Sequence, residues 1–119
     1  MVDLSVFDAA ALLALVGDDK ELMQEIVELY LKEYPRILSD IRAAAASGEA
    51  RALEFSAHAL KGSVSNMAAR RAYAAAMELE TLARADQLPA ARDSLTTLER
   101  ELTSLQRALQ VTGTDPAPA

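Results

Sequence analysis

The segment FSAHALKGSVSN holds the chain's single histidine, His58, among residues suited to binding and transferring an anion. An imidazole can act as a nucleophile near neutral pH. Lys61, three residues later, can bring an ammonium group towards the ring, and Gly62 removes the side chain that would stack beside it at i+4. Such a combination suits an imidazole that another protein approaches and that carries an anion such as a phosphoryl group.

Apolar periodicity predicts that this histidine faces solvent. The apolar stripe of the surrounding helix consists of Leu53, Ala57, Leu60, Val64 and Met67. At about 100° per residue, His58 falls about 140° from Leu53, close to the angular position of Gly62. We therefore expect an exposed imidazole, with Glu54, Phe55 and Ser65 as neighbours that a partner could contact.

A glycine within this helix is unexpected on propensity alone. Gly17 and Gly48 are predicted to end helices, whereas Gly62 is predicted to lie inside one. A glycine inside a helix costs roughly 1 kcal/mol relative to alanine. In an alanine-rich chain this cost indicates a functional reason, although a lone exposed histidine is more often an ordinary surface residue.

Helices account for the remainder of the chain, because strand-type runs are missing and good helix formers dominate. We predict an all-α fold, an antiparallel up-down four-helix bundle with a short N-terminal helix across one end. The short helix is expected over Phe7–Val16. The bundle helices are expected over residues 18–47 (kinked or restarted at Pro35), 49–66, 70–86 and 89–110. Asp18 is the predicted N-cap of the first of these helices.

Domain boundaries follow from the same pattern. Residues 1–111 form the predicted bundle domain, and the segment 112–119, TGTDPAPA, is predicted to be a disordered or linker-like tail. Ser63 and Asn66 are expected to have structural roles near the end of the histidine-bearing helix.

Composition excludes several function classes. The formal net charge of −6 disfavours binding to nucleic acid or to an anionic membrane. The chain has no cysteine and one histidine, so no metal site is expected. It has neither a transmembrane run nor a basic N-terminal region. A monomeric, cytoplasmic protein is the simplest interpretation.

The segment His58–Ala69, H-A-L-K-G-S-V-S-N-M-A-A, resembles the signature of histidine phosphotransfer (HPt) domains, H-x-L-K-G-S-x-x-N-x-G-A. Ala68 stands where that pattern has glycine. The likeness extends to the lead-in FDAAALLALVGDDKELMQEIVELYL, to SGEARALEFSAHALKGS and to ELETLAR, so it covers nearly the whole chain.

This resemblance implies a phosphocarrier that is not an enzyme by itself. His58 would accept a phosphoryl group from a receiver-domain phosphoaspartate and pass it to another receiver. Lys61 would offset phosphoryl charge, Gly62 would leave room for the group and the receiver, and Glu80 would orient the imidazole. Partners would be response-regulator receiver domains and a hybrid histidine kinase. No cofactor is expected, because the receiver would supply Mg²⁺.

Three alternatives remain open at the level of sequence. The chain could be a docking module that has lost the chemistry, or the phosphoacceptor domain of a larger histidine kinase. A true enzyme has little support, because no catalytic triad order, phosphate-binding loop or metal-ligand spacing is present.

Overall fold

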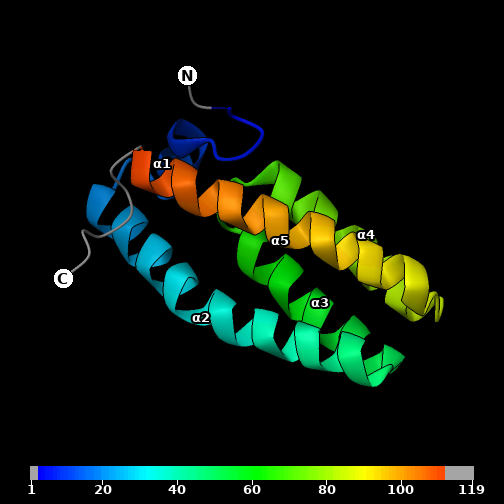
Figure 1. The fold of residues 1–119 in the computed structure, drawn as a ribbon. Coiled ribbons are helices and arrows are strands. Elements are labelled where there is room, and N and C mark those ends of the chain that lie inside the picture. The colour runs from blue at the N-terminus through cyan, green and yellow to red at the C-terminus, as the bar shows by residue number, and fades with distance from the viewer. Residues whose placement is uncertain (1–2, 112–119) are drawn as a thin grey trace.

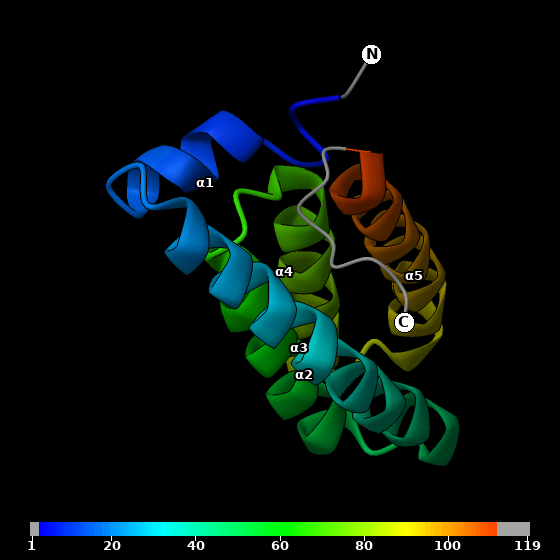
Figure 2. The same cartoon turned by 90° about the vertical axis from the view of Figure 1, so that its left-hand side faces the viewer.

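The computed structural model describes residues 3–111, which are entirely helical apart from turns and short connections. A short helix precedes four long ones: α1 (Ala9–Leu15), α2 (Lys20–Ser47), α3 (Ala50–Ser65), α4 (Arg70–Arg84) and α5 (Leu88–Val111). The long helices form an antiparallel bundle, and α1 lies across one end of it (Figures 1 and 2). The predicted all-α architecture is confirmed, whereas the predicted tail lies outside the described residues.

α3 and α4 form the central pair of the bundle. α3 packs against both α2 and α4, and α4 packs against both α3 and α5, whereas α2 and α5 touch each other little. A seam of leucines on α5 lies in the core: Leu98, Leu102, Leu105 and Leu109 are buried, and Leu95 is partly buried. The buried face of α4 carries several alanines, and these small side chains allow neighbouring helices to approach closely.

α2 continues through Pro35 as a single helix. Proline in a helix interior removes one backbone hydrogen bond and usually kinks or ends the helix, and the sequence left a kink or a restart open. The chain does not restart there. Pro35 is exposed, while Tyr30, Leu38 and Ile41 on either side of it are buried. We infer that packing of this apolar face outweighs the lost hydrogen bond.

Asp19, not Asp18, caps the start of α2, so the predicted capping residue was wrong. The Asp19 carboxylate accepts a hydrogen bond from the Leu22 N–H at 3.0 Å. Asp18 has φ +63° and follows Gly17 with φ +65°. An N-cap residue needs extended backbone, so the left-handed turn after α1 excludes Asp18 from that role.

The N-terminal segment is fastened to the connection between α3 and α4. The Asp8 N–H donates to the Ala68 carbonyl at 3.0 Å, and the Arg71 N–H donates to the Ser5 carbonyl at 2.9 Å. The Phe7 side chain is fully buried. These contacts hold α1 across the end of the bundle, and Phe7 itself precedes α1, which is shorter than predicted at both ends.

Candidate functional site

His58 projects from the middle of α3, and 66% of its side chain is exposed. This agrees with the orientation predicted from apolar periodicity. Its Nδ1 lies 2.7 Å from Oε2 of Glu80 on α4. An ionised carboxylate only accepts hydrogen bonds, so Nδ1 carries a proton, and in the neutral ring Nε2 keeps its lone pair. The neutral ring therefore presents a nucleophilic nitrogen away from Glu80.

Glu80 is a nearly buried carboxylate shared by three basic groups. Its side chain is 5% exposed, and besides His58 it contacts Lys61 Nζ at 2.7 Å and Arg84 Nη2 at 3.1 Å. Burial alone would raise the pKa of Glu80. The hydrogen bond from Lys61, followed by the one from His58, instead holds that pKa below its usual value. Glu80 thus stays ionised where it meets the imidazole.

Arg84 belongs to the same cluster, although sequence reasoning did not single it out. Its Nε donates to Oε2 of Glu54 on α3 at 2.8 Å. Both side chains of this ion pair are partly exposed, Arg84 to 61% and Glu54 to 32%. The hydrogen bond to Glu54 is the main cause that raises the pKa of Arg84 above its usual value. The i,i+4 spacing of Glu80 and Arg84 was the available sequence signal.

Gly62 leaves open space beside the imidazole. A Cβ atom built at this position meets nothing within 4 Å. Helical side chains lean towards the N-terminus, so any side chain at position 62 would project towards His58. Ser65, one turn beyond, is exposed and donates from Oγ to the Gly62 carbonyl at 2.7 Å. Its predicted contact with a receiver stays a prediction.

A hollow beside His58 opens between α3 and α4. It is lined by Arg51, Glu54, Phe55, His58, Glu80 and Arg84. Phe55 is 77% exposed, and an aromatic ring this exposed is suited to contact with a partner. Lys61 is not among the lining residues, because its ammonium group turns to Glu80. The structure thus brings together His58, Glu54, Phe55 and Glu80, while their functional roles stay predictions.

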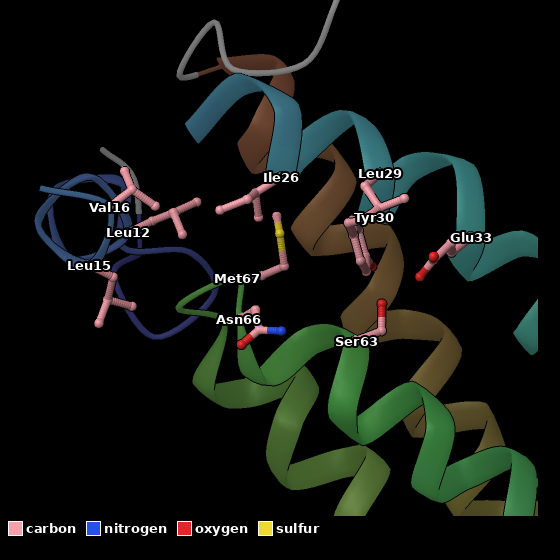
Figure 3. Close-up of a pocket in the computed structure, with 10 residues that line it drawn as sticks. All are labelled: Leu12, Leu15, Val16, Ile26, Leu29, Tyr30, Glu33, Ser63, Asn66 and Met67. Atoms are coloured by element: carbon pink, nitrogen blue, oxygen red, sulfur yellow. The ribbon is translucent and has the colours of Figure 1, made fainter. Parts of the chain in front are cut away.

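A separate hollow lies where α1, α2 and α3 meet (Figure 3). Its walls are mainly apolar, with Ser63 of α3 and Asn66, which caps the end of α3, on one side. The buried Tyr30 hydroxyl beside it has no hydrogen-bond partner among the described residues. His58 and its partners do not line this hollow, so the reactive imidazole and this corner of the bundle are distinct.

Residues 3–111 contain neither a candidate membrane-spanning helix nor a candidate metal site. No helix in that range is both long enough and apolar enough to cross a membrane. No group of three or more His, Cys, Asp or Glu side chains in that range could hold a metal ion.

The chain is similar to known proteins in both sequence and fold. The family model for the Hpt domain matches residues 25–108. Among solved structures, the HPT domain of the Hpt sensor hybrid histidine kinase from Shewanella superposes with a TM-score of 0.81. It is 18% identical in sequence, over 97% of this chain and 100% of that one. Histidine-containing phosphotransfer protein B from Pseudomonas aeruginosa is 28% identical over 87% of this chain and 91% of that one, with a TM-score of 0.78. No curated protein sequence matches the chain.

Proposed function

Because this chain belongs to the Hpt domain family, we propose that it is a phosphorelay intermediate. His58 accepts a phosphoryl group from the phosphoaspartate of one receiver domain and passes it to the aspartate of another. One observation carries the proposal: an exposed imidazole whose Nδ1 lies 2.7 Å from a nearly buried carboxylate. In the neutral ring this leaves Nε2 as the unprotonated nitrogen of an exposed side chain.

The transfer of the phosphoryl group to His58 needs no added acid or base. The Nε2 lone pair forms the N–P bond while the P–O bond to the aspartate breaks, and that electron pair stays on the aspartate carboxylate. Nδ1 keeps its proton, so the ring becomes positively charged. A charge-assisted hydrogen bond to Glu80 stabilises that charge. In the second transfer an aspartate oxygen attacks phosphorus, and the ring departs as neutral imidazole.

Supporting roles follow from position. Lys61 keeps Glu80 ionised through its 2.7 Å contact, and its positive charge offsets part of the phosphoryl charge. Gly62 leaves room for the phosphoryl group and for the receiver. Phe55, together with Glu54 and Ser65, forms the surface that the receiver contacts. The receiver's own Mg²⁺ neutralises charge on the phosphoryl oxygens during transfer, so this chain acts as a phosphocarrier and not as an independent enzyme.

We propose that the chain acts as a monomer in the cytoplasm. Its partners are response-regulator receiver domains and a hybrid histidine kinase that supplies the first phosphoryl group. A surface with an open imidazole and an exposed aromatic ring beside it fits a transient partner, because each receiver must dock and leave in turn.

The direct test is transfer from a ³²P-labelled receiver domain. We expect label to move from the receiver to the wild-type chain and to a second receiver. His58→Gln should abolish the labelled intermediate. The control is Ala52→Gln, an exposed change on the same helix. If His58→Gln accepts label as well as Ala52→Gln does, the proposal is wrong. If His58→Gln binds receivers with unchanged affinity, and no phosphorylated intermediate can be trapped in the wild type, the chain is instead a docking module.

A further inference from the structure

Lys61 and Arg84, the two cations that contact Glu80, differ in how far their side chains are exposed to solvent. Lys61 is 22% exposed and contacts Oε1 of a carboxylate that is itself 5% exposed. If Lys61 turned towards solvent, it would leave a nearly buried carboxylate with less compensation, which is unfavourable. Arg84 is 61% exposed, and it lines the hollow next to His58. Arg84 is therefore the cation that can move at little cost.

The bond from Arg84 to Glu54 is replaceable. It joins two partly exposed side chains at 2.8 Å, and exposed ion pairs of this kind contribute little to stability. A guanidinium also presents a planar fork of donors that matches phosphoryl oxygens better than a lysine ammonium does. An incoming phosphoryl group could thus displace the Glu54 carboxylate without a change in fold.

Distance and charge both favour this exchange. Arg84 Nη2 and His58 Nδ1 contact the same oxygen, Oε2 of Glu80, at 3.1 and 2.7 Å. The guanidinium and the imidazole therefore lie beside the same carboxylate oxygen. A phosphoryl group brings about −1.5 to −2 charges, next to the carboxylates of Glu54 and Glu80. A cation in the hollow beside His58 would offset this charge, and Arg84 lines that hollow.

We propose that Arg84 is the phosphoryl-binding cation of this site, held in reserve by Glu54 and released to the phosphoryl group when His58 is modified. This inference rests on the proposed phosphorylation of His58. In the modified state, Arg84 keeps its contact with Glu80 and exchanges the Glu54 carboxylate for phosphoryl oxygens. Lys61 remains on Glu80, where its charge offsets part of the phosphoryl charge without binding the group directly.

The experiment uses phosphoramidate, so that no receiver is needed. The P–N bond of phosphoramidate breaks, ammonia leaves with its electron pair, and Nε2 of His58 forms the new N–P bond. With ammonium salt added, intact mass spectrometry gives the equilibrium between modified and free protein. This equilibrium constant does not depend on docking or on rate. Peptide mapping identifies the modified residue.

Four variants separate a phosphoryl-binding cation from a structural bridge. We expect Arg84→Ala to lower the equilibrium constant roughly fivefold, and Arg84→Lys to recover part of the loss. Glu54→Gln should raise it, since the competing carboxylate is gone. Arg42→Ala is the matched control, because Arg42 pairs with Glu99 at 2.6 Å on α2 and α5, away from the site. Its constant should equal that of the wild type.

Three results would overturn the inference. In the first, Arg84→Ala matches the Arg42→Ala control. In the second, Arg84→Ala and Glu54→Gln fall together, as they would if the pair only braced α3 against α4. In the third, phosphoramidate fails to modify His58 in the wild-type chain. A chain that behaves as expected with phosphoramidate but exchanges no label with receivers would contradict the proposed function and leave the role of Arg84 intact.

Discussion

Glu80 sets the chemistry of the neighbouring imidazole because it is charged and nearly buried at once. Three basic side chains, from His58, Lys61 and Arg84, meet its two oxygens at 2.7–3.1 Å. A glutamine could still accept one hydrogen bond, but it would leave two cations without their shared carboxylate. Orientation of the ring and retention of the Nδ1 proton therefore depend on the negative charge at this position.

Stability should depend on pH through Glu80. Its pKa is held below the ordinary value of 4.5, first by the hydrogen bond from Lys61. A carboxyl group with a lowered folded-state pKa contributes stability that is present above the unfolded value. That contribution is lost as pH falls below 4.5 and through the folded pKa. We expect Glu80→Gln to destabilise the chain clearly at pH 7 and much less at pH 3, as measured by urea unfolding.

The control for this measurement is Glu78→Gln, an exposed change on the same helix that also removes one negative charge. A cost for Glu80→Gln that is equally large at both pH values would show that lost packing, and not lost charge, is responsible.

Substitutions at Gly62 should affect stability and phosphoryl transfer in opposite directions. Because a Cβ there meets nothing within 4 Å, Gly62→Ala should stabilise α3 by up to about 1 kcal/mol in thermal unfolding. Gly62→Gln should preserve the fold yet slow transfer from a receiver, since the longer side chain leans towards His58. Ala52→Gln serves as the control of equal size on the same helix. Equal transfer rates in the two glutamine variants would mean that the open space has no functional value.

At the scale of elements, the connection from α3 to α4 carries backbone strain. Ala68 has φ +52°, a left-handed conformation that costs a non-glycine residue about 1–2 kcal/mol. The HPt signature has glycine at this position, and glycine adopts such a conformation at no steric cost. The Ala68 carbonyl also accepts a hydrogen bond from the Asp8 N–H at 3.0 Å, which helps to hold the strained residue in place.

Ala68→Gly should therefore relieve strain. Part of the gain is offset by the greater freedom of glycine in the unfolded chain, so the expected net stabilisation is about 0.5–1 kcal/mol in chemical denaturation. Ala43→Gly, an exposed change inside α2, should have the opposite sign and destabilise by about 1 kcal/mol. Two changes of the same sign would contradict strain at Ala68.

Periodicity predicted the helices well because each one buries a continuous apolar stripe, and it placed His58 outside such a stripe. It could not predict how α2 passes Pro35, since the outcome depends on packing either side of the proline. It also misassigned the cap at Asp18, where the preceding left-handed glycine decides the backbone. Arg84 was missed because its importance arises from Glu54, which is thirty positions away in sequence and adjacent only once α3 and α4 pack.

At the scale of the whole molecule, the histidine site and the N-terminal attachment lie in different parts of the bundle. His58 and Glu80 lie within α3 and α4, whereas Arg71 joins the start of α4 to α5 and to the N-terminal segment. Arg71 makes two hydrogen bonds to the buried Glu101 at 2.6 and 2.8 Å, and it contacts Asp3 at 3.2 Å. Substitution of Arg71 should therefore lower stability without changing phosphoryl transfer.

Arg71→Met tests this separation. It leaves the Glu101 carboxylate buried without its bidentate partner, so we expect a lower Tm than in Arg42→Met, which breaks the more exposed pair with Glu99. Below the Tm, modification of His58 by phosphoramidate should proceed to the same equilibrium in both variants, because the α3–α4 pair alone shapes the site. A Tm equal to that of Arg42→Met would show that Arg71 is not a structural link. A changed equilibrium at His58 would show that the end of the bundle and the site are coupled.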